Sequence, residues 1–423
     1  MTALDVGAAR RRYILLIALR WLPTGLLIPV TVLLALSRGL TLTEIGLVFA
    51  IQGLVVLALE LPTGGLSDAL GRRPVLILAS IVGLASLGLL YVADSVALFA
   101  ASTFLQGVYR ALDSGPLEAW FVDATLAADP DAGIEKGLSS GSMVASVAIA
   151  LGALAAGALV ALDPVGAVPA LALPLLVALA LGVVNLVAIV VLMREAPFVH
   201  GLGAVADSVR AVPKVVGDGI GLLRASRVLL ALVSVELFWG VASVAFERLF
   251  PIRLSEAVGD LDRAAALMGP VSSLAWFAAA AGAAGVVLLS DRIGVARSAA
   301  VLRIGQGATI MAMGMIAGPI GLVTAFLACY AAHGASNPMH TTLLHREVDG
   351  AHRTTVLSMN SMVAQPAGAV GAILLAALAD GTSISTAMIV AGIACALAAP
   401  LYLPAWRAER ERRHPVVAGA AIA

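Results

Sequence analysis

The chain has 423 residues, of which 61% are hydrophobic and 12% are charged. Soluble domains carry about twice that share of charged residues, so a soluble globular fold, which could not cover so much apolar surface, is excluded. The 26 basic and 26 acidic residues balance, which gives no indication of nucleic acid or of an anionic surface as a partner.

Apolar stretches of about twenty residues, separated by short polar segments, run through the whole chain; an α-helix of this length crosses the roughly 30 Å hydrocarbon core of a membrane. A membrane β-barrel would show segments of about ten alternating residues, whereas a stretch such as Val168–Met193 is continuously apolar. We therefore predict an all-α membrane protein with twelve transmembrane helices. The first six are expected at 11–36, 43–66, 74–92, 96–122, 138–162 and 168–193, and the second six at 228–250, 264–289, 298–317, 321–345, 354–378 and 385–404.

A long polar stretch separates the two sets of six helices. It predicts three parts: an N-terminal six-helix bundle at 1–193, a cytoplasmic linker at 194–227, and a C-terminal six-helix bundle with a short cytoplasmic tail at 228–423. Lys and Arg near membrane ends stay on the cytoplasmic side, and most of the 26 basic residues fall there if both termini are inside. We therefore expect a multi-pass inner-membrane protein with both termini in the cytoplasm.

Two sequence echoes indicate that the halves are repeats. LSSGSMVA, from Leu138, matches LSMNSMVA, from Leu357, and each opens the fifth helix of its half. SDALG, ending at Gly71, matches SDRIG, ending at Gly294, and each follows the second helix of its half. This pattern predicts two pseudo-symmetric bundles, as parallel repeats about an axis normal to the membrane.

The loop between the second and third predicted helices reads GGLSDALGRRP, from Gly64 to Pro74. It resembles the signature loop of the major facilitator superfamily, which runs glycine, apolar, small, Asp, two residues, Gly, Arg and a basic residue. The resemblance extends to the twelve spans, the repeat and the weakened copy after the eighth helix. It implies a transporter, and ALDSGPLEAWFVDA and HRTTVLS are similar to stretches of bacterial multidrug facilitators of the efflux type.

The resemblance also implies a gate around this loop. Asp68 stands in a tight turn and can face the positive end of the eleventh helix. In the family, the Asp at this position locks the two halves in the outward-facing state. Arg72 would pair with Asp123, and by symmetry Asp291 would face the start of the fifth helix. The alternative is that Arg72 and Arg73 only set the topology. The predicted gate residues are Gly65, Asp68, Gly71, Arg72, Arg73, Asp123 and Asp291.

Two departures from the efflux pattern leave the direction of transport open. Proton-coupled efflux families often carry an Arg three residues before the Gln-Gly pair of the fourth helix, where this chain has Thr103 before Gln106. The Gly-Pro signature of the fifth helix is degraded to Gly152 and Ala153.

Ionisable residues inside the predicted spans indicate a site, because each costs roughly 2.5 to 3.5 kcal/mol at the membrane centre and should face protein or a wet cavity. They are Arg20, Glu60, Arg110, Asp113, Glu118, Glu236, His333 and His340. From these we predict a substrate and proton cavity formed by Arg20, Arg110, Asp113, Glu236 and His333.

Within this cavity we expect Asp113, held beside Arg110, to accept a proton, and Glu236 to lie across the cavity as a counter-charge or as a contact for a cationic substrate. The alternative is that Arg110 and Asp113 form a fixed ion pair that holds the halves together. Glu60 is expected to pair with Arg20.

These observations favour a secondary transporter that works by alternating access, with proton-coupled efflux of a small amphiphilic or drug-like molecule, and we expect a monomer without a cofactor. A facilitator or symporter that imports a small metabolite is the alternative. The absence of a P-loop pattern disfavours ATP drive, and the absence of HExxH and GxSxG patterns disfavours an intramembrane enzyme. Cys329 and Cys395 are expected to pack in the spans and to bind no metal.

Overall fold

The computed structural model describes residues 5–195, 203–348 and 353–413, and all regular structure in these ranges is helical. The first half contains α1 (Val6–Leu27), α2 (Thr31–Ser37), α3 (Leu42–Leu70), α4 (Arg72–Val92), α5 (Val96–Asp113), α6 (Pro116–Ala128), α7 (Glu135–Leu162) and α8 (Leu173–Leu192). The second half contains α10 (Arg227–Val244), α11 (Phe250–Val258), α12 (Leu261–Ile293), α13 (Val295–Met315), α14 (Pro319–Arg346), α15 (Arg353–Gly381), α16 (Ile384–Leu397) and α17 (Leu403–Arg413).

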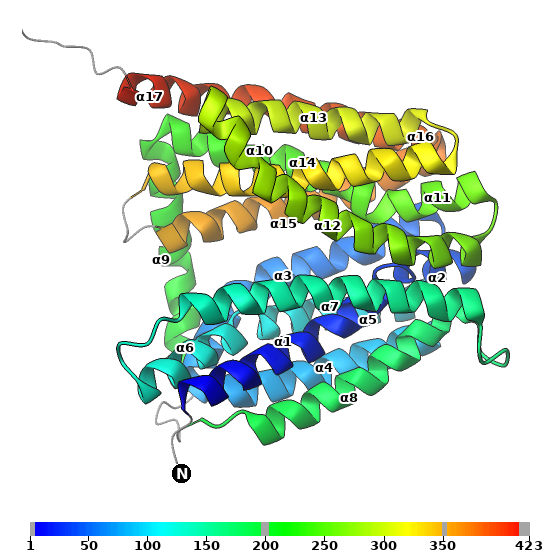
Figure 1. Cartoon of the computed structure of the whole chain (residues 1–423), viewed down its shortest axis with the longest axis horizontal. Helices are drawn as coiled ribbons and strands as arrows, with labels where there is room; N and C mark the ends of the chain where they lie inside the picture. Colours follow the sequence, from blue (N-terminus) through cyan, green and yellow to red (C-terminus); the bar gives the residue numbers. More distant parts are fainter. Residues whose placement is uncertain (1–4, 196–202, 349–352, 414–423) are drawn as a thin grey trace, which may run out of the picture.

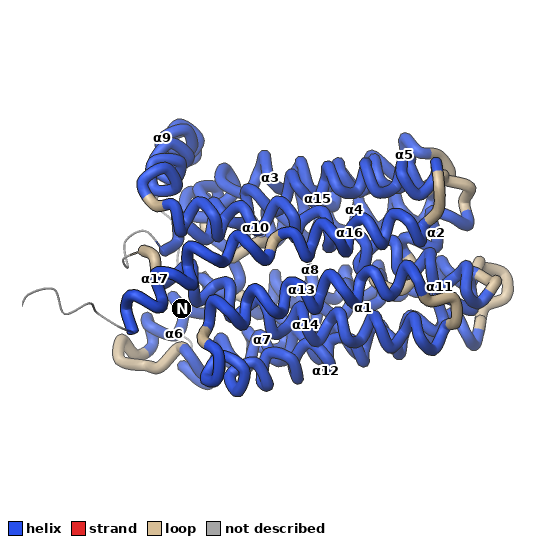
Figure 2. Tube along the Cα trace, turned by 90° about the horizontal axis from the view of Figure 1, so that it is seen from above, coloured by secondary structure: helices blue, strands red, loops and turns tan. Residues whose placement is uncertain are grey.

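The two halves form two bundles that lie side by side with their helices roughly parallel (Figure 1). Helix α9 (Gly203–Ala225) stands across one end of both bundles, where α1 begins and α17 ends, and it packs against α3, α10 and α15. Figure 2, a view turned by 90°, shows that α9 lies beside the bundles. We call this the linker end, and the opposite end, where α2 and α11 lie, the far end. The predicted linker thus contains a helix.

Ten helical runs in the described ranges are long and apolar enough to cross a membrane, as expected of a multi-pass membrane protein. The predicted spans 96–122 and 298–317 are not among them, so the count of twelve stays a prediction. The first corresponds to two helices, α5 and α6, that are broken at Ser114 and Gly115. The second corresponds to α13, whose Arg297, Arg303 and Gln306 lower its hydropathy.

The break between α5 and α6 has a local cause. Gly115 has φ +93°, in the left-handed region that glycine adopts without strain, and Pro116 follows with no N–H to continue the helix. A different irregularity follows α10, where Ala245–Leu249 form a π-helical turn inside one continuous helical run. Such turns are rare and occur often at functional sites.

The loops that join the second and third helices of each half have the same backbone conformation. Gly71 has φ +91° and ψ 157°, and Gly294 has φ +88° and ψ 161°. The carboxylate of Glu195 accepts hydrogen bonds from the first two backbone N–H groups of α4, and that of Glu409 does the same at α13. The sequence echo at these loops therefore marks equivalent structures.

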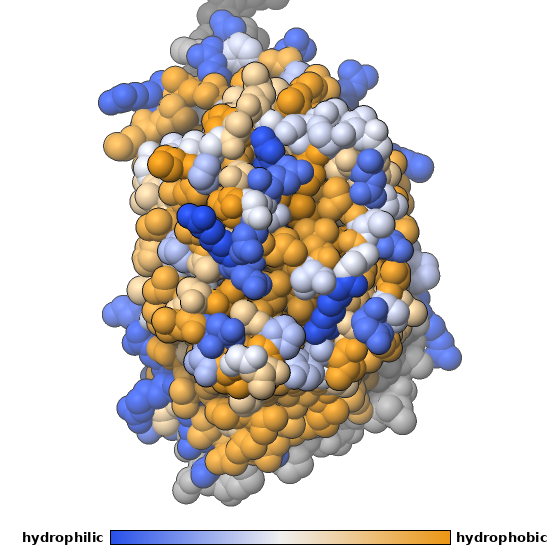
Figure 3. Space-filling view, turned by 90° about the vertical axis from the view of Figure 1, so that its right-hand side faces the viewer, coloured by the Kyte–Doolittle hydropathy of each residue, from blue (hydrophilic) through white to orange (hydrophobic). Residues whose placement is uncertain are grey.

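The halves contact each other mainly through α3 with α15 and α7 with α12, and these contacts are tightest toward the far end. Thr43 donates a hydrogen bond to Asp380 of the other half, and Ser273 Oγ donates to the Ala150 carbonyl over 2.6 Å. Gly157 and Gly269 bring the backbones of α7 and α12 together. Apolar side chains cover most of the middle of this end (Figure 3).

The linker end is packed differently. Side chains of α12 are mostly buried from Ala264 to Ala275, but mostly exposed from Ala280 to Leu288. On α7, the side chains of Met143 and Val147 are likewise exposed, while those of Ile149 and Ala150 are buried. The two halves are therefore closed against each other at the far end and separate toward the linker end.

Candidate functional site

Arg20, on α1, forms the central ion pair of the N-terminal bundle. Its Nε lies 2.5 Å from Oδ2 of Asp113, at the end of α5, and its Nη1 lies 3.5 Å from Oε1 of Glu118, on α6. Both Arg20 and Asp113 have largely covered side chains, with 12% and 11% exposed, whereas 39% of the Glu118 side chain is exposed. The pair thus lies inside the bundle, and Glu118 is its less covered member.

The helix break explains why Arg20 reaches this position. Because Pro116 and Leu117 begin a new helix, the Asp113 carbonyl loses its helical hydrogen-bond partner, which is costly in a membrane. Arg20 Nη2 donates a hydrogen bond to this carbonyl over 3.0 Å. One guanidinium therefore satisfies both the carboxylate and the main chain at the break, and joins the first helix of the bundle to the fourth.

Two predicted pairings are wrong. Asp113 lies beside Arg20 and not beside Arg110, although residues three apart share a helix face, because the helix ends at Asp113. The suggested fixed pair of Arg110 and Asp113 is therefore not formed. Glu60 does not pair with Arg20; its carboxylate instead accepts a long hydrogen bond, 3.5 Å, from Ser361 of the other half.

Arg110 faces the C-terminal bundle. It is exposed and lies within electrostatic range of Glu247 and Arg248, which belong to the π-helical turn of the other half. Glu247 is also reached by solvent, although protein surrounds it. Because these charges come from different bundles, they face each other across the interface between the halves. The sequence analysis did not single out Glu247, since it lies close to the end of the predicted helix 228–250.

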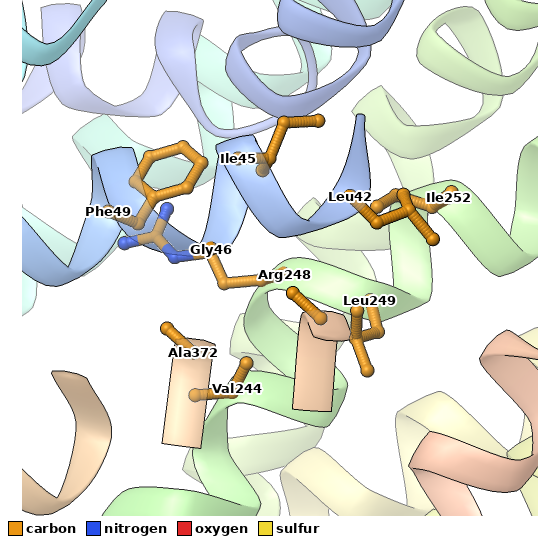
Figure 4. A pocket seen from close by; sticks show the side chains of 10 residues that line it. Leu42, Ile45, Gly46, Phe49, Val244, Arg248, Leu249, Ile252 and Ala372 are labelled. Atoms are coloured by element: carbon orange, nitrogen blue, oxygen red, sulfur yellow. The ribbon is translucent and has the colours of Figure 1, made fainter. Parts of the chain in front are cut away.

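Arg248 closes the interface on the far side of these charges. Its guanidinium lies 4.1 Å from the ring centroid of Phe49 on α3, in a cation–π contact (Figure 4). A small apolar pocket surrounds this contact, and its lining comes from both halves: Leu42, Ile45, Gly46, Phe49, Val244, Arg248, Leu249, Ile252, Ala372 and Ala376. This layer separates Arg110 and Glu247 from the far end.

Glu236, on α10, is enclosed within the C-terminal bundle, with 5% of its surface exposed. Its Oε1 lies 3.2 Å from Nε2 of His340, and Oδ1 of Asn360 lies 3.1 Å from the same nitrogen. Because both oxygens accept, Nε2 carries a proton, and Nδ1 is left to accept from the Tyr402 hydroxyl over 3.0 Å. Glu236 therefore does not join Arg20 and Asp113.

Arg303, on α13, supplies the positive charge of this cluster. It is 3% exposed, lies within electrostatic range of Glu236 and Tyr402, and donates a hydrogen bond to Gln306 over 2.9 Å. The sequence analysis missed Arg303, although a charged residue inside a predicted span is the signal that selected the other site residues. Each half thus joins its first helix to its fourth through a covered charged contact.

His333, on α14, lies in a group of aromatic side chains. Its ring stacks on Trp239 with centroids 5.7 Å apart and lies 5.7 Å from Phe246. Among the described residues, neither His333 Nδ1 nor Trp239 Nε1 has a hydrogen-bond partner. This cluster offers aromatic faces and two open polar atoms beside the π-helical turn.

The predicted gate is described in part. Arg72 Nη2 lies 3.0 Å from Oδ2 of Asp123, so the expected pair is formed. Arg73 Nη2 donates to the carbonyl of Val190 over 2.6 Å, which ties it to α8. Asp291 is exposed.

The backbones of Asp68 and Gly65 belong to α3, but their side-chain surroundings lie outside the described part of the structure. The gating role of the loop stays a prediction. Sequence reasoning missed Glu195 and Glu409, which cap the helices after the two loops.

Across the described ranges, no group of His, Cys, Asp or Glu could hold a metal ion. Both cysteines are buried as free thiols.

Comparison with known protein families gives one match. The sequence profile of the Major Facilitator Superfamily matches residues 13–372. A search of curated protein sequences found no significant match.

Similar solved structures share the fold at low identity. They include the nucleoside transporter NupG, with 12% identity, a TM-score of 0.78, and coverage of 94% of this chain and 99% of that one. A bacterial homologue of the human lysosomal transporter Spinster, in an inward-facing and occupied conformation, has 14% identity, a TM-score of 0.71 and coverage of 94% and 96%. A structure from work on proton-dependent oligopeptide transporters has 12% identity, a TM-score of 0.71 and coverage of 96% and 99%.

Proposed function

The chain belongs to the major facilitator superfamily, and from this premise we propose that it is a secondary transporter that exports a small amphiphilic or drug-like molecule in exchange for protons. It is a transporter and not an enzyme. The direction, the coupling ion and the kind of substrate are the proposed part.

One observation carries the proposal. The halves are closed at the far end by the layer around Arg248 and Phe49, and separate toward the linker end, with Arg110 and Glu247 reached by solvent between them. Charged side chains at that depth are costly unless a wet cavity opens to them. With the termini in the cytoplasm, as the basic residues predict, this arrangement is the inward-facing state of an alternating-access cycle.

The Arg20 and Asp113 pair is the proposed proton site. An ionised Asp113 binds the guanidinium of Arg20, and this contact holds α1 against the break between α5 and α6. Protonation removes the charge of Asp113 and weakens the contact, while the half-buried Glu118 carboxylate remains as a second partner for Arg20. The proton thus changes the packing of α1 against the break between α5 and α6, which is the kind of two-state element that coupling requires.

The proposed substrate contacts are Glu247, Arg110 and the aromatic group around His333. Glu247 offers a carboxylate to a cationic head group, and Trp239 and His333 offer stacked rings to an apolar body. Open polar atoms on both rings add hydrogen bonds to a ligand. This combination suits an amphiphilic molecule better than a fully polar metabolite.

The test uses the full chain in proteoliposomes with an imposed pH gradient and a fluorescent organic cation. We expect gradient-driven accumulation that is lost in Asp113→Asn, because the amide cannot take up a proton. Glu256→Gln is the matched control, since this carboxylate pairs with the neighbouring Arg253 at the far end. Flux that ignores the gradient in the unmodified chain would contradict the proposal and favour a facilitator. Coupling that persists in Asp113→Asn would contradict the assignment of Asp113 as the proton site.

A further inference from the structure

The two halves meet mainly along two lines of contact, one between α3 and α15 and the other between α7 and α12. We call them the α3–α15 seam and the α7–α12 seam. The repeat makes them equivalent, because α3 and α12 precede the matching loops at Gly71 and Gly294, and the matching sequences from Leu138 and Leu357 lie near the starts of α7 and α15. Any difference between the seams is therefore specific to one side of the molecule.

Toward the far end the two seams are alike. Gly46 of α3 and Gly269 of α12 stand equally far before the two loops. A methyl group on Gly46 would lie 2.4 Å from the carbonyl oxygen of Ala372 on α15. One on Gly269 would lie 2.8 Å from the carbonyl oxygen of Ala153 on α7, which holds the place of Ala372 in the repeat. Equivalent residues thus make equivalent contacts, and both seams have the same register.

Toward the linker end the seams differ. Ser361 Oγ of α15 donates a hydrogen bond to Glu60 of α3 over 3.5 Å, and both residues are half-buried. In the same register, Ala283 of α12 stands in the place of Glu60. Ser142 of α7 stands in the place of Ser361, and its hydroxyl donates to the Leu138 carbonyl of its own helix over 3.2 Å. Because alanine has no acceptor to offer, this pair cannot bridge the α7–α12 seam, and both of its members are exposed.

The faces of α7 and α12 that touch at Ala150 and Ser273 come apart toward the linker end. Residues three or four apart share a helix face, so each face can be followed turn by turn beyond this contact. Ala150 and Ser273 are buried, but the residues that follow them on the two faces are exposed: Ser146, Ser142 and Ser139 on α7, and Phe277, Ala280 and Ala283 on α12. One edge of the opening therefore presents hydroxyl groups and the other presents apolar side chains.

Helix α9 adds a second barrier to the α3–α15 seam. It packs against both helices of that seam, and a methyl group on Gly219 of α9 would lie 2.5 Å from the sulfur of Met359 on α15. Figure 2 shows α9 on the side of α3 and α15, with α7 and α12 on the opposite side of the molecule. The side that lacks the bridge is thus also the side away from α9.

We propose that the α7–α12 seam is a lateral portal, through which an amphiphilic substrate passes from the cytoplasmic leaflet of the membrane into the space between the halves. The proposal rests on the proposed function. Roughly 10 Å of helix separate Ser142 from the start of α7, so the opening reaches below the head groups to the acyl chains. A cationic head group moves along the hydroxyls of α7 while the apolar body stays against α12, as amphiphiles divide at a membrane surface.

Single-cysteine variants of the full chain in lipid nanodiscs test the portal, with Cys329 and Cys395 replaced by alanine. Ser142→Cys and Ser361→Cys make the same nearly isosteric change at equivalent positions of the two seams. Leu151→Cys is the reference for lipid contact. Its side chain is 55% exposed and lies at the depth where the halves touch, so it faces the bilayer.

Two measurements on each variant separate lipid contact from water contact. Phospholipids with a nitroxide near the head group quench a bimane fluorophore on a cysteine that lipid reaches, and a membrane-impermeant maleimide reacts with a cysteine that water reaches. We expect Ser142→Cys to react with the maleimide and its bimane to lose as large a fraction of fluorescence as that of Leu151→Cys. Bimane on Ser361→Cys should keep its fluorescence, and Leu151→Cys should not react.

Three results would overturn the portal. Unquenched bimane on Ser142→Cys would mean that the space between the halves is sealed from lipid. Quenching without maleimide reaction there would mean an ordinary lipid-facing surface. Equal quenching of Ser142→Cys and Ser361→Cys would mean that the two seams open alike.

A transport measurement tests whether the substrate uses this route. Ala283→Trp fills the opening from the α12 edge and should slow accumulation of the fluorescent organic cation, whereas Leu151→Trp, on the lipid-facing surface, should leave it unchanged. Unchanged accumulation in a monodisperse Ala283→Trp variant would overturn the route. The labelling does not depend on transport, so its failure refutes the portal alone, and flux that ignores the pH gradient in the unmodified chain refutes the proposed function alone.

Discussion

Gly157 on α7 offers a direct test of alternating access, because it lies where the halves touch most closely. A methyl group on it would lie 2.6 Å from the carbonyl oxygen of Ala266 and 2.8 Å from the Cα of Gly269, both on α12 of the other half. Backbone atoms cannot move aside as a flexible side chain does. Gly157→Ala should therefore force the halves apart at the far end and disfavour the observed state.

Overpacking of this kind costs about 1 to 3 kcal/mol, and about 1.4 kcal/mol changes an equilibrium tenfold. The variant should thus shift the balance between the two states by roughly 5- to 150-fold toward the state that is open at the far end. Gly285→Ala is the control, because it makes the same change on α12 where nothing lies within 4 Å.

The assay follows thiol labelling of Ser273→Cys, a position that is buried at the same contact. The two native cysteines, Cys329 and Cys395, are buried and are replaced by alanine in all variants. A membrane-impermeant maleimide added from the far side should react faster in Gly157→Ala than in Gly285→Ala. Equal labelling rates in the two variants would refute the idea that this contact opens during the cycle.

Two further predictions address the helix caps and the C-terminal cluster. Glu195→Gln should lower the free energy of unfolding by about 1 to 2 kcal/mol, because the carboxylate binds two backbone N–H groups at the positive end of α4. Urea unfolding measures this change, with Asp129→Asn, at an exposed carboxylate, as the control. Equal stability of the two variants would contradict the prediction. Glu236→Gln should lower the free energy of unfolding by on the order of 3 kcal/mol, because Arg303 loses its buried counter-charge. The variant should nevertheless keep proton-driven transport in proteoliposomes. Loss of coupling in a folded variant would show that the cluster takes part in proton transfer.

The sequence predicted the fold well because its signals are physical and long. Apolar runs long enough for the membrane mark most helices, and the echo at Gly71 and Gly294 marks loops with matching backbone conformations. The two runs that fall short, at α5 with α6 and at α13, are those that carry charges or a break into the bundle core. A hydropathy pattern is weakest where a helix breaks or carries several polar residues.

The site was predicted less well because pairing depends on where helices break and how they rotate. Counting depth along straight helices placed Asp113 beside Arg110. Because the helix breaks at Gly115 and Pro116, the carbonyl and the carboxylate of Asp113 instead accept hydrogen bonds from Arg20. The π-helical turn similarly places Glu247 between the halves. Sequence spacing contains the proline and glycine of the first case, but it contains no sign of the second.

In each bundle a charged contact joins the first helix to the fourth, and we call this contact the joint of the bundle. The two joints differ, and the difference indicates which bundle responds to a proton. In the C-terminal half, Glu236 and His340 lie among Arg303, Asn360 and Tyr402, and both ring nitrogens of His340 already have hydrogen-bond partners. A proton added there would break a filled hydrogen-bond network. In the N-terminal half, Arg20 has a second carboxylate, that of Glu118, within reach. Because only this joint can lose one contact and keep others, proton uptake should act on the N-terminal bundle, with the C-terminal cluster holding its own bundle rigid.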